Sequence, residues 1–420
     1  MNNQPLNQIF DVLIIGGGPS GLMAATELIE YDCSICLIEA MPTIGRKFLM
    51  AGKSGLNITT SKKNFVAEYG ESARWILPLI KKYGPKEIIK LCESLGQTLF
   101  IGSSGKVFPK VMKSSPLLRS WLVRLTDAGV VIRTSSRWVD LNQVYKKDAV
   151  QGTSKQFVHE ITSNGKSYLI QARATILALG GASWSKLGSD GKWKNILKRH
   201  FFDSKKSLIP FAPSNMGIII PWSNHMLKFE GHPVKSIAIK VNGKTKKGEF
   251  VVTRNGVEGG IIYLFSTTEL GTPKELEIDL LPNFSILQIC KKLEREQRKL
   301  SISNFLRKSL GLKGVKFGLL CEYAFPFPKV NLEFAMAIKN LKIKVKGGYP
   351  MDYAISTRGG IAKEAVNQDL MLNDLPGIFC AGEMLDWTAP TGGFLLTGCF
   401  STGSRAGKSV ARYLSLKLPS

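Results

Sequence analysis

Several features that mark whole classes of protein are missing from this chain of 420 residues. No apolar run is long enough to span a bilayer. The first apolar run, Val12 to Ile15, leads directly into glycines and not into a small-residue cleavage site. We therefore expect a strand near the N-terminus, no membrane partner and a cytoplasmic location. No internal repeat or low-complexity segment is visible, so solenoids and disordered chains are excluded as classes.

Cysteine and histidine are few, at seven and four residues. An odd number of scattered cysteines argues against a disulfide framework. The one C-x-x-C pair, Cys33 and Cys36, lies in a strand-like run that puts its two members on opposite faces. Two small core residues are therefore favoured over a redox pair. With no second cysteine pair, we expect no metal site.

Acidic residues are scarce relative to basic ones, with 32 Asp and Glu against 57 Lys and Arg, a net charge of +25. Such an excess can mark a nucleic-acid or membrane-surface partner. The excess is concentrated in residues 190–346, which hold 28 basic and 13 acidic residues. The helical part of this stretch would supply the phosphate contacts, from Lys291, Lys292, Arg295, Arg298, Lys299, Arg307, Lys308, Lys313 and Lys316. Glu294 and Glu296 interrupt the run, so a solvated helix face is the alternative.

Glycine is abundant, with 41 residues, and its first cluster carries the most specific motif. Gly16 to Gly21 matches G-x-G-x-x-G between an expected strand, residues 11–15, and an expected helix, residues 21–31. In such a loop the first glycine permits the turn, the second lets the backbone approach a pyrophosphate, and the third lets the helix pack on the strand. Glu39 ends the next expected strand, residues 33–39, where an acid accepts hydrogen bonds from an adenosine ribose. The unit predicts a dinucleotide cofactor without a ribose 2′-phosphate.

The remaining pattern predicts a discontinuous α/β domain. Helical spacing covers residues 86–95 and 114–127, the second opened by a Ser114-Ser115-Pro116 cap, and 130–132 is strand-like. A hairpin over 156–172 turns at Asn164-Gly165, and a buried strand follows over 175–179. The sequence pattern is typical of β-strands from about residue 208 to 280, with a turn at Asn242-Gly243. From about 284 to 340 the pattern is typical of helices. We expect a first cofactor segment over 1–190, a β-rich insertion over 191–283, a basic helical subdomain over 284–346, and a second cofactor segment over 347–420.

A second glycine-rich motif lies near the C-terminus. The strand-like run ending at Gly382-Glu383 is followed by Ala389-Pro390-Thr391-Gly392-Gly393-Phe394, which opens a helix reaching about Leu414. This pattern resembles the glutathione-reductase-like FAD superfamily, whose second motif ends a strand in Gly-Asp. Here Glu383 replaces that aspartate. Gly180-Gly181 resembles the Ala-Thr-Gly element of the same superfamily.

Further motifs narrow the resemblance. They are Gly45 to Asn57, Ser115 to Arg119, Ser356 to Gly360 and the Glu-Met-Leu-Asp-Trp run at 383–387. Together they resemble the bacterial aminoacetone-oxidase-like FAD flavoproteins over nearly the whole chain. The resemblance implies a Rossmann-like FAD domain with an insertion, and an oxidase that takes a small aminoketone to its imine and passes electrons to oxygen.

The expected cofactor contacts come from all of these motifs: Gly16, Gly18, Pro19, Ser20, Gly21, Glu39, Ala40, Arg46, Lys47, Gly180, Gly181, Gly382, Glu383, Thr391, Gly392, Gly393 and Phe394. Lys53, Trp387 and Thr391 are the candidates for positions beside the flavin ring. No second G-x-G-x-x-G unit follows a strand, so no dedicated nicotinamide domain is expected. Electrons would come from a bound substrate or from transiently docked NAD(P)H. Two alternatives to an amine oxidase stay open: a flavoenzyme that reduces uridine in RNA, and a flavin-binding protein without catalysis.

Overall fold

The computed structural model describes residues 8–53, 55–148, 152–241, 243–267, 273–294 and 300–418. The chain forms two compact units. Unit 1 comprises residues 1–213 and 356–420, and unit 2 comprises residues 214–355. Asn242, Arg295, Glu296, Arg298 and Lys299, which the sequence analysis singled out, lie outside the described residues.

Unit 1 is built around a mixed sheet with a parallel core. The strands follow the spatial order β6-β2-β1-β9-β8-β7, and β19 pairs with β9 off this path. β1 pairs in parallel with β2 and β9, while β7, β8 and β9 form an antiparallel meander. The bounds are β1 (Gln8–Ile15), β2 (Ile35–Ile38), β6 (Val131–Arg133), β7 (Arg137–Asp148), β8 (Gly152–Ser163), β9 (Lys166–Leu177) and β19 (Ile378–Cys380).

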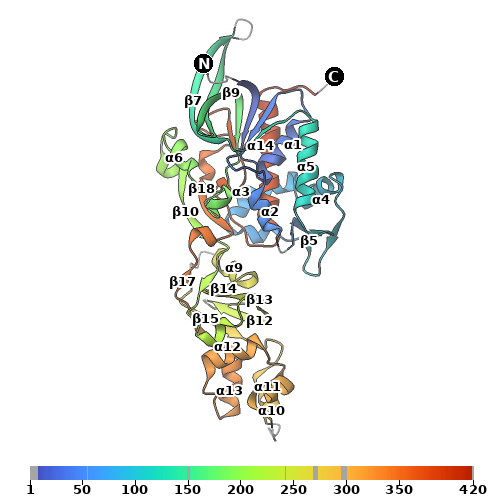
Figure 1. Ribbon diagram of the computed structural model, residues 1–420, viewed down its shortest axis with the longest axis vertical. Helices are drawn as coiled ribbons and strands as arrows, with labels where there is room; N and C mark the ends of the chain where they lie inside the picture. The colour runs from blue at the N-terminus through green and yellow to red at the C-terminus, as the bar shows by residue number, and fades with distance from the viewer. Residues whose placement is uncertain are drawn as a thin grey trace. The chain divides into compact units, whose positions relative to one another are not determined.

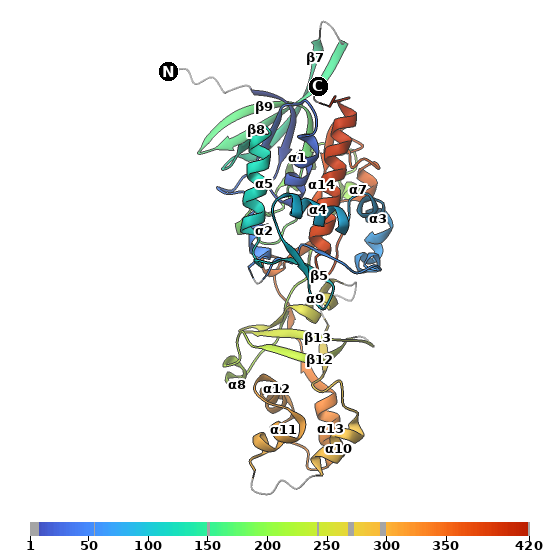
Figure 2. The same ribbon diagram turned by 90° about the vertical axis from the view of Figure 1, so that its right-hand side faces the viewer.

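The sheet is buried on both faces where its central strands are continuously apolar, as in Val12–Ile15 of β1 and throughout β2. Leu13 and Ile15 of β1 belong to one hydrophobic cluster, and Val12 and Ile14 belong to the cluster on the other face. The first cluster includes side chains from the C-terminal segment. The second is covered by α1 (Pro19–Leu28), α5 (Ser115–Asp127) and α14 (Phe394–Tyr413), which lie side by side (Figures 1 and 2). A Cβ at Gly407 of α14 would lie 2.7 Å from the Ala24 carbonyl oxygen, so small residues let α14 approach α1 closely.

Smaller elements complete unit 1. β10 and β18 form a two-stranded ribbon, and β3, β5 and β4 form a three-stranded sheet. Their bounds are β3 (Thr59–Thr60), β4 (Leu99–Ile101), β5 (Lys106–Pro109), β10 (Leu208–Ser214) and β18 (Ser356–Ile361). The helices are α2 (Arg46–Ala51), α3 (Ala73–Lys82), α4 (Pro85–Ser94), α6 (Trp193–Leu197) and α7 (Ser204–Ser207). The short 3-10 turns are η1 (Val66–Ser72), η2 (Ser185–Leu187), η4 (Lys363–Ala365) and η5 (Gly382–Met384).

Unit 2 is one body in which helices pack on a sheet. Seven strands follow the order β16-β15-β12-β13-β14-β11-β17. They are β11 (Ile218–Ile219), β12 (Pro233–Val241), β13 (Lys244–Thr253), β14 (Gly256–Glu258), β15 (Glu275–Asp279), β16 (Leu341–Lys344) and β17 (Gly347–Gly348). The helices are α8 (Asn224–Leu227), α9 (Gly260–Thr267), α10 (Ile286–Leu293), α11 (Ile302–Leu310), α12 (Val315–Ala324) and α13 (Asn331–Lys339), with a 3-10 turn η3 (Met351–Tyr353).

The predicted segment boundaries at 191 and 347 differ from the observed division. Residues 191–213 remain in unit 1, where β10 pairs with β18. Residues 347–355 belong to unit 2, where β17 pairs with β11. The β-rich and helical parts of the insertion share one hydrophobic cluster, in which Ile278 of β15 and Ile338 of α13 are both fully buried. The division into separate 191–283 and 284–346 segments therefore does not correspond to separate cores.

Most predicted elements are confirmed, with local corrections. The Gly21–Tyr31 helix is α1, the strand at 33–39 is β2, and the helices at 86–95 and 114–127 are α4 and α5. The hairpin turns at Asn164 and Gly165, both with positive φ. The separate strand predicted at 175–179 is wrong, because β9 is continuous: its first half pairs with β8 and its second half with β19. Ser114 precedes α5 but makes no side-chain cap, since its Oγ donates to the Leu49 carbonyl at 3.4 Å.

The cysteines of the C-x-x-C pair are free thiols, as expected for core residues. Burial raises the pKa of both Cys33 and Cys36 to about 11. Within the described ranges, no group of three or more His, Cys, Asp or Glu residues is arranged to hold a metal ion. Among the described helices, none has the combination of length and apolar character that would carry it across a membrane.

Candidate cofactor site

The glycine loop after β1 faces open space at one position only. Gly16 has φ 112°, and a Cβ there would collide with the Ala178 carbonyl. A Cβ at Gly21 would collide with the Gly16 carbonyl, so this glycine allows α1 to pack against the loop. At Gly18, by contrast, no atom lies within 4 Å of a built Cβ. The N-terminus of α1 carries no side-chain cap, which leaves its first amides and the positive end of its dipole available to an anion.

Glu39 lies directly after β2 and is anchored to the loop. Its Oε2 accepts the Gly17 amide at 3.0 Å, and its Oε1 accepts the Met41 amide at 2.8 Å. Burial raises the pKa of this carboxyl, and the two backbone hydrogen bonds act in the opposite direction. Each carboxylate oxygen keeps lone pairs for a further donor, as a ribose hydroxyl would require.

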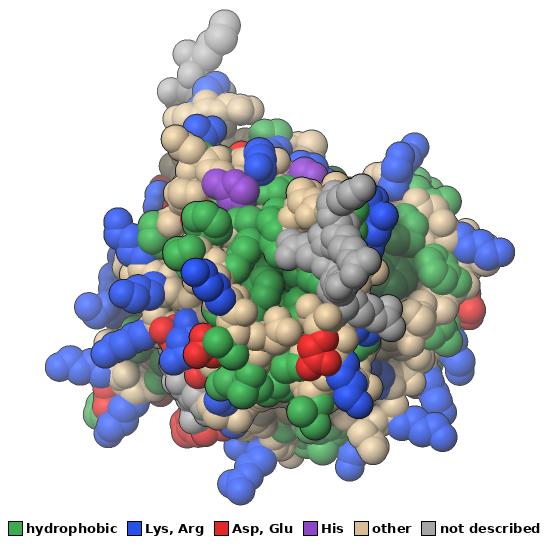
Figure 3. All heavy atoms as spheres, turned by 90° about the horizontal axis from the view of Figure 1, so that it is seen from below, with side chains coloured by type: hydrophobic (Ala, Val, Ile, Leu, Met, Phe, Trp, Pro, Cys, Tyr) green, Lys and Arg blue, Asp and Glu red, His purple; other side chains and the backbone are tan. Residues whose placement is uncertain are grey.

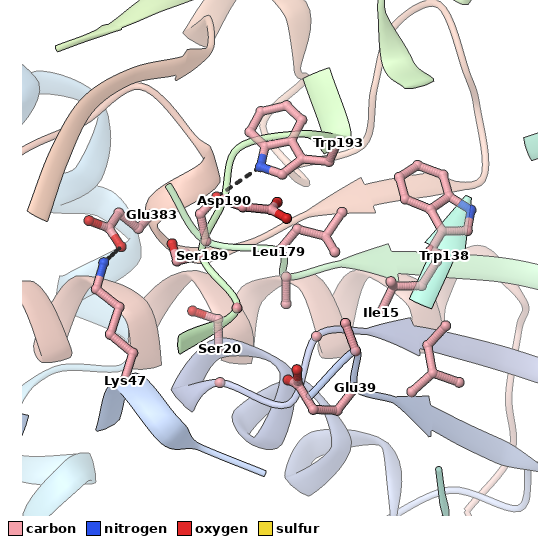
Figure 4. A pocket seen from close by; sticks show the side chains of 18 of the residues that line it. Ile15, Ser20, Glu39, Lys47, Trp138, Leu179, Ser189, Asp190, Trp193 and Glu383 are labelled. Carbon is pink, nitrogen blue, oxygen red and sulfur yellow. Dashed lines mark hydrogen bonds and ion pairs between the residues drawn. The ribbon is translucent and has the colours of Figure 1, made fainter. Parts of the chain in front are cut away.

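A cavity of about 340 Å³ runs along the carboxyl ends of the parallel strands, within the size range of cofactor pockets. Of the residues predicted to contact the cofactor, those that line it are Gly16, Gly18, Pro19, Ser20, Glu39, Ala40, Arg46, Lys47, Gly180, Gly382 and Glu383. Figure 4 shows Lys47 and Glu383 on one side of the pocket and Trp138 on the other. Two buried polar atoms on its walls, Arg46 Nε and Ser189 Oγ, have no hydrogen-bond partner within the described chain. Unpaired buried donors in a cavity fit a polar ligand.

Glu383 is held by residues from two distant segments, and one of them, Lys47, is in turn bonded to a third segment. Lys47 Nζ lies 2.7 Å from Glu383 Oε2 and donates to Ser183 Oγ at 2.7 Å. The Thr357 amide of β18 donates to Glu383 Oε1 at 2.8 Å. The carboxylate side chain is only 12% exposed. Lys47 and Glu383 therefore form a fixed pair of opposite charges in the wall of the cavity.

The other predicted contacts have different surroundings. Gly181 and the Thr391-to-Phe394 turn are absent from the lining of the cavity. Gly393 has φ 87°, and a Cβ there would lie 2.6 Å from the Thr59 backbone. Phe394 stacks on Phe65 with ring centroids 6.4 Å apart. Gly393 and Phe394 are therefore packed against other parts of the protein, namely Thr59 and Phe65.

Two of the residues predicted to lie beside the flavin ring are also outside this cavity. Lys53 is exposed on a turn after α2. Trp387 is buried, donates from Nε1 to the Gly382 carbonyl at 2.9 Å, and packs its ring against Gly398. Its surroundings are those of a core residue.

Two stretches of the cavity wall were not predicted from the sequence. One is the start of β7, Ser136 to Val139, and the other is the segment from Leu187 to Ile196. Arg137 and Asp190 join the two stretches by an ion pair of 3.0 Å, and Trp193 donates to the Gly180 carbonyl at 2.9 Å. The first stretch could have been proposed from the sequence, because it comes shortly after the strand predicted at 130–132.

Comparison with known proteins shows the family to which the chain belongs. The family model described as "HI0933-like protein Rossmann domain" matches residues 10–409. The 3-dehydro-bile acid delta(4,6)-reductase of Clostridium scindens is 25% identical, over 95% of this chain and 98% of that protein. The ribosomal RNA dihydrouridine synthase of Haemophilus influenzae is 22% identical, over 97% of this chain and 100% of that protein.

Solved structures share the fold at low identity. A quinol-fumarate reductase superposes with a TM-score of 0.52 at 14% identity, over 97% of this chain and 72% of that one. The 3-ketosteroid delta1-dehydrogenase of Sterolibacterium denitrificans has a TM-score of 0.50 at 12% identity, over 97% of this chain and 100% of that one. The open glycine loop, the acid after β2 and the unpaired donors fit the adenosine and pyrophosphate of FAD. The chain is an FAD-dependent oxidoreductase and belongs to the HI0933-like Rossmann family.

Proposed function

We propose that this flavoenzyme reduces a carbon–carbon double bond conjugated to a carbonyl group. The proposal rests on the activities named for two relatives that match over nearly the full length of the chain. One is named as a delta(4,6)-reductase of a 3-dehydro bile acid and covers 95% of this chain; the other is named as a dihydrouridine synthase and covers 97%. Dihydrouridine is uridine with its conjugated ring double bond reduced, so the two names describe the same type of chemistry.

The residues of the cavity would hold FAD as follows. The amides at the start of α1 would face the pyrophosphate beside Gly18. Glu39 would accept the ribose hydroxyls, and the Lys47–Glu383 pair would lie against the ribityl chain. When bound and reduced, the flavin would supply the hydride for the β-carbon of the substrate and return to oxidised FAD, with a proton going to the α-carbon. NAD(P)H, docked transiently, would return two electrons and a proton.

The small-amine oxidase implied by the aminoacetone-oxidase-like resemblance is the competing proposal. It requires an amine site next to the flavin ring, with oxygen as the electron acceptor. Of the residues expected there, Lys53, Trp387 and Thr391, none lines the cavity. No described contact of these three favours an amine over another substrate.

RNA as the substrate is one form of the proposed reductase, and the basic insertion bears on it. Lys291, Arg307, Lys308 and Lys313 are exposed. Lys316 is not free for phosphate, because its Nζ donates to the Ser236 carbonyl at 2.9 Å and to the Leu280 carbonyl at 2.8 Å. Burial also lowers the pKa of Lys316. The remaining basic residues would give a binding affinity with a salt slope of roughly −0.7 to −0.9 per neutralised phosphate.

Anaerobic photometry of the two half-reactions tests the proposal. NADH or NADPH should bleach the oxidised flavin, and aminoacetone should not. A steroid enone or a uridine-containing RNA, added without oxygen, should then restore the yellow colour, and which of them does so identifies the substrate class. Bleaching by aminoacetone, with colour restored by oxygen and by neither enone nor RNA, would replace the reductase with the amine oxidase. A flavin that no donor bleaches would favour a non-catalytic flavin-binding protein.

A further inference from the structure

The helical end of unit 2 exposes large apolar side chains that have no role in the cofactor site. They come from α10, from the segment between α12 and α13, and from α13 itself: Leu287, Phe325, Val330, Leu332 and Met336. Leu287 is 73% exposed and Phe325 is 72% exposed. Figure 3 looks onto this end and shows hydrophobic side chains gathered in the middle of the view. We call these five residues the apolar end patch.

The elements that carry the patch are packed against one another at this end of unit 2. α10 and α13 run antiparallel: Cys290 Sγ donates to the Asn331 carbonyl at 3.6 Å, and Lys339 Nζ donates to the Phe284 carbonyl at 2.8 Å. This arrangement places Leu287, near the start of α10, beside the second half of α13. Leu332 and Met336 are four residues apart in α13 and so share one helix face.

Phe325 is fixed to the same helix through a chain of aromatic rings. Its ring meets that of Phe327 at 5.6 Å, and Phe327 stacks on Phe334 of α13 at 5.2 Å. Phe334 is buried in the core of unit 2, so the exposed ring stands on a rigid base. An apolar patch held out by ordered packing marks an interaction site.

The charge around the patch selects the partner. Among the described residues of 284–340, five basic side chains are exposed against two acidic ones: Lys291, Arg307, Lys308, Lys313 and Lys329 against Glu294 and Glu333. Lys329 directly precedes Val330, and Lys291 lies about one helical turn after Leu287 in α10, although Glu333 is exposed beside Leu332. A second copy of the chain would bring like charges together. Nucleobases would stack on Phe325 alone, since the other four side chains are aliphatic and offer no π face.

We propose that the apolar end patch docks onto an anionic lipid surface. Leucine, valine, methionine and phenylalanine enter the boundary between headgroups and acyl chains, and the surrounding lysines contact lipid phosphates. The expectation of no membrane partner rested on the length of apolar runs. Run length detects spanning segments and not a patch assembled from several elements. The proposal goes beyond the reductase activity and does not depend on it.

Vesicle flotation of the full, FAD-loaded chain tests the proposal. Wild type should float with vesicles of phosphatidylcholine and phosphatidylglycerol in equal parts, and much less with pure phosphatidylcholine. A Leu332→Ser/Met336→Ser double variant should bind the anionic vesicles on the order of tenfold more weakly, and Lys291→Gln/Lys329→Gln should flatten the salt dependence. The matched control is Phe202→Ser, which removes a side chain that is 99% exposed in unit 1.

Each other outcome would overturn the proposal. Failure of wild type to float with anionic vesicles would remove it. An equal loss in Phe202→Ser would mean that the patch has no special role. A dimer in sedimentation velocity that the double variant converts to monomer would assign the patch to a second copy of the chain. Binding of RNA that is lost in Phe325→Ser, without vesicle binding, would assign it to RNA.

Discussion

The two glycine-rich turns of unit 1 have similar compositions and opposite surroundings. In the first, Gly16 to Gly21, the middle glycine has nothing within 4 Å of a built Cβ. In the second, Gly392-Gly393, a Cβ on Gly393 would lie 2.6 Å from the backbone of Thr59. Both precede a helix, α1 in the first case and α14 in the second. The comparison teaches that a glycine motif predicts close approach to its backbone, while only the structure distinguishes approach by a ligand from approach by the protein itself.

The largest effect is expected from Gly18→Val. The new side chain would occupy the place of the pyrophosphate, so the purified protein should carry no measurable FAD. Since the space at Gly18 is empty of protein, the melting temperature of the apoprotein should stay near that of wild-type apoprotein. Gly347→Val is the control, because Gly347 of unit 2 also has no atom within 4 Å and should keep its FAD. Full FAD content in Gly18→Val would contradict the assignment of the loop.

Gly393→Ala should primarily destabilise the fold and should affect FAD binding less. Its φ of 87° and the contact with Thr59 combine strain with a clash, which should lower the free energy of unfolding by about 2–5 kcal/mol. Gly311→Ala separates the two causes, because Gly311 has φ 68° with nothing within 4 Å. That control should cost about 1 kcal/mol. Denaturant unfolding of the apoproteins measures both, and equal losses would remove the clash from the explanation.

Glu383→Ala should leave a folded protein that retains FAD poorly. Removing a charge-assisted hydrogen bond from a buried site costs roughly 1.5–3 kcal/mol of binding free energy. The variant also leaves Lys47 without its carboxylate partner at 2.7 Å. Titration of apoprotein with FAD measures the change, with Glu364→Ala as a control at an exposed acid of unit 1. Unchanged affinity would refute a role for Glu383 at the ribityl chain.

The smallest effect is expected from Glu39→Gln, which should weaken FAD binding by about 1 kcal/mol. The amide keeps one acceptor oxygen, whereas its nitrogen opposes the Gly17 amide. Burial raises the pKa of Glu39, so wild-type FAD affinity should fall as the pH is lowered through that raised value and the carboxylate is protonated. The variant should lack this part of the pH dependence. A wild type and a variant with the same pH profile would exclude Glu39 as the titrating group.

Local motifs were predictable and long-range ones were not. The Gly16–Gly21 loop, Glu39 and α1 follow from contiguous residues, so one βαβ unit was enough to place them. Ser136 to Val139 had only the neighbouring strand prediction as a signal, and Asp190 reaches the cavity through the segment between β9 and α6, which no local pattern encodes. Trp387 was expected beside the flavin, with plain packing as the alternative, and no sequence pattern indicated its hydrogen bond to the Gly382 carbonyl.

The most direct test of the account is the identity of the flavin that the protein carries. The cavity is lined by the glycine loop, by Glu39, which is placed to accept hydrogen bonds from an adenosine ribose, and by Trp138. Denaturation of the purified protein, followed by chromatography of the released pigment, should therefore yield FAD in an amount equal to the protein. Release of FMN, or binding of FMN and FAD with equal affinity by the apoprotein, would contradict the assignment, because FMN leaves the adenosine end of this cavity without a ligand.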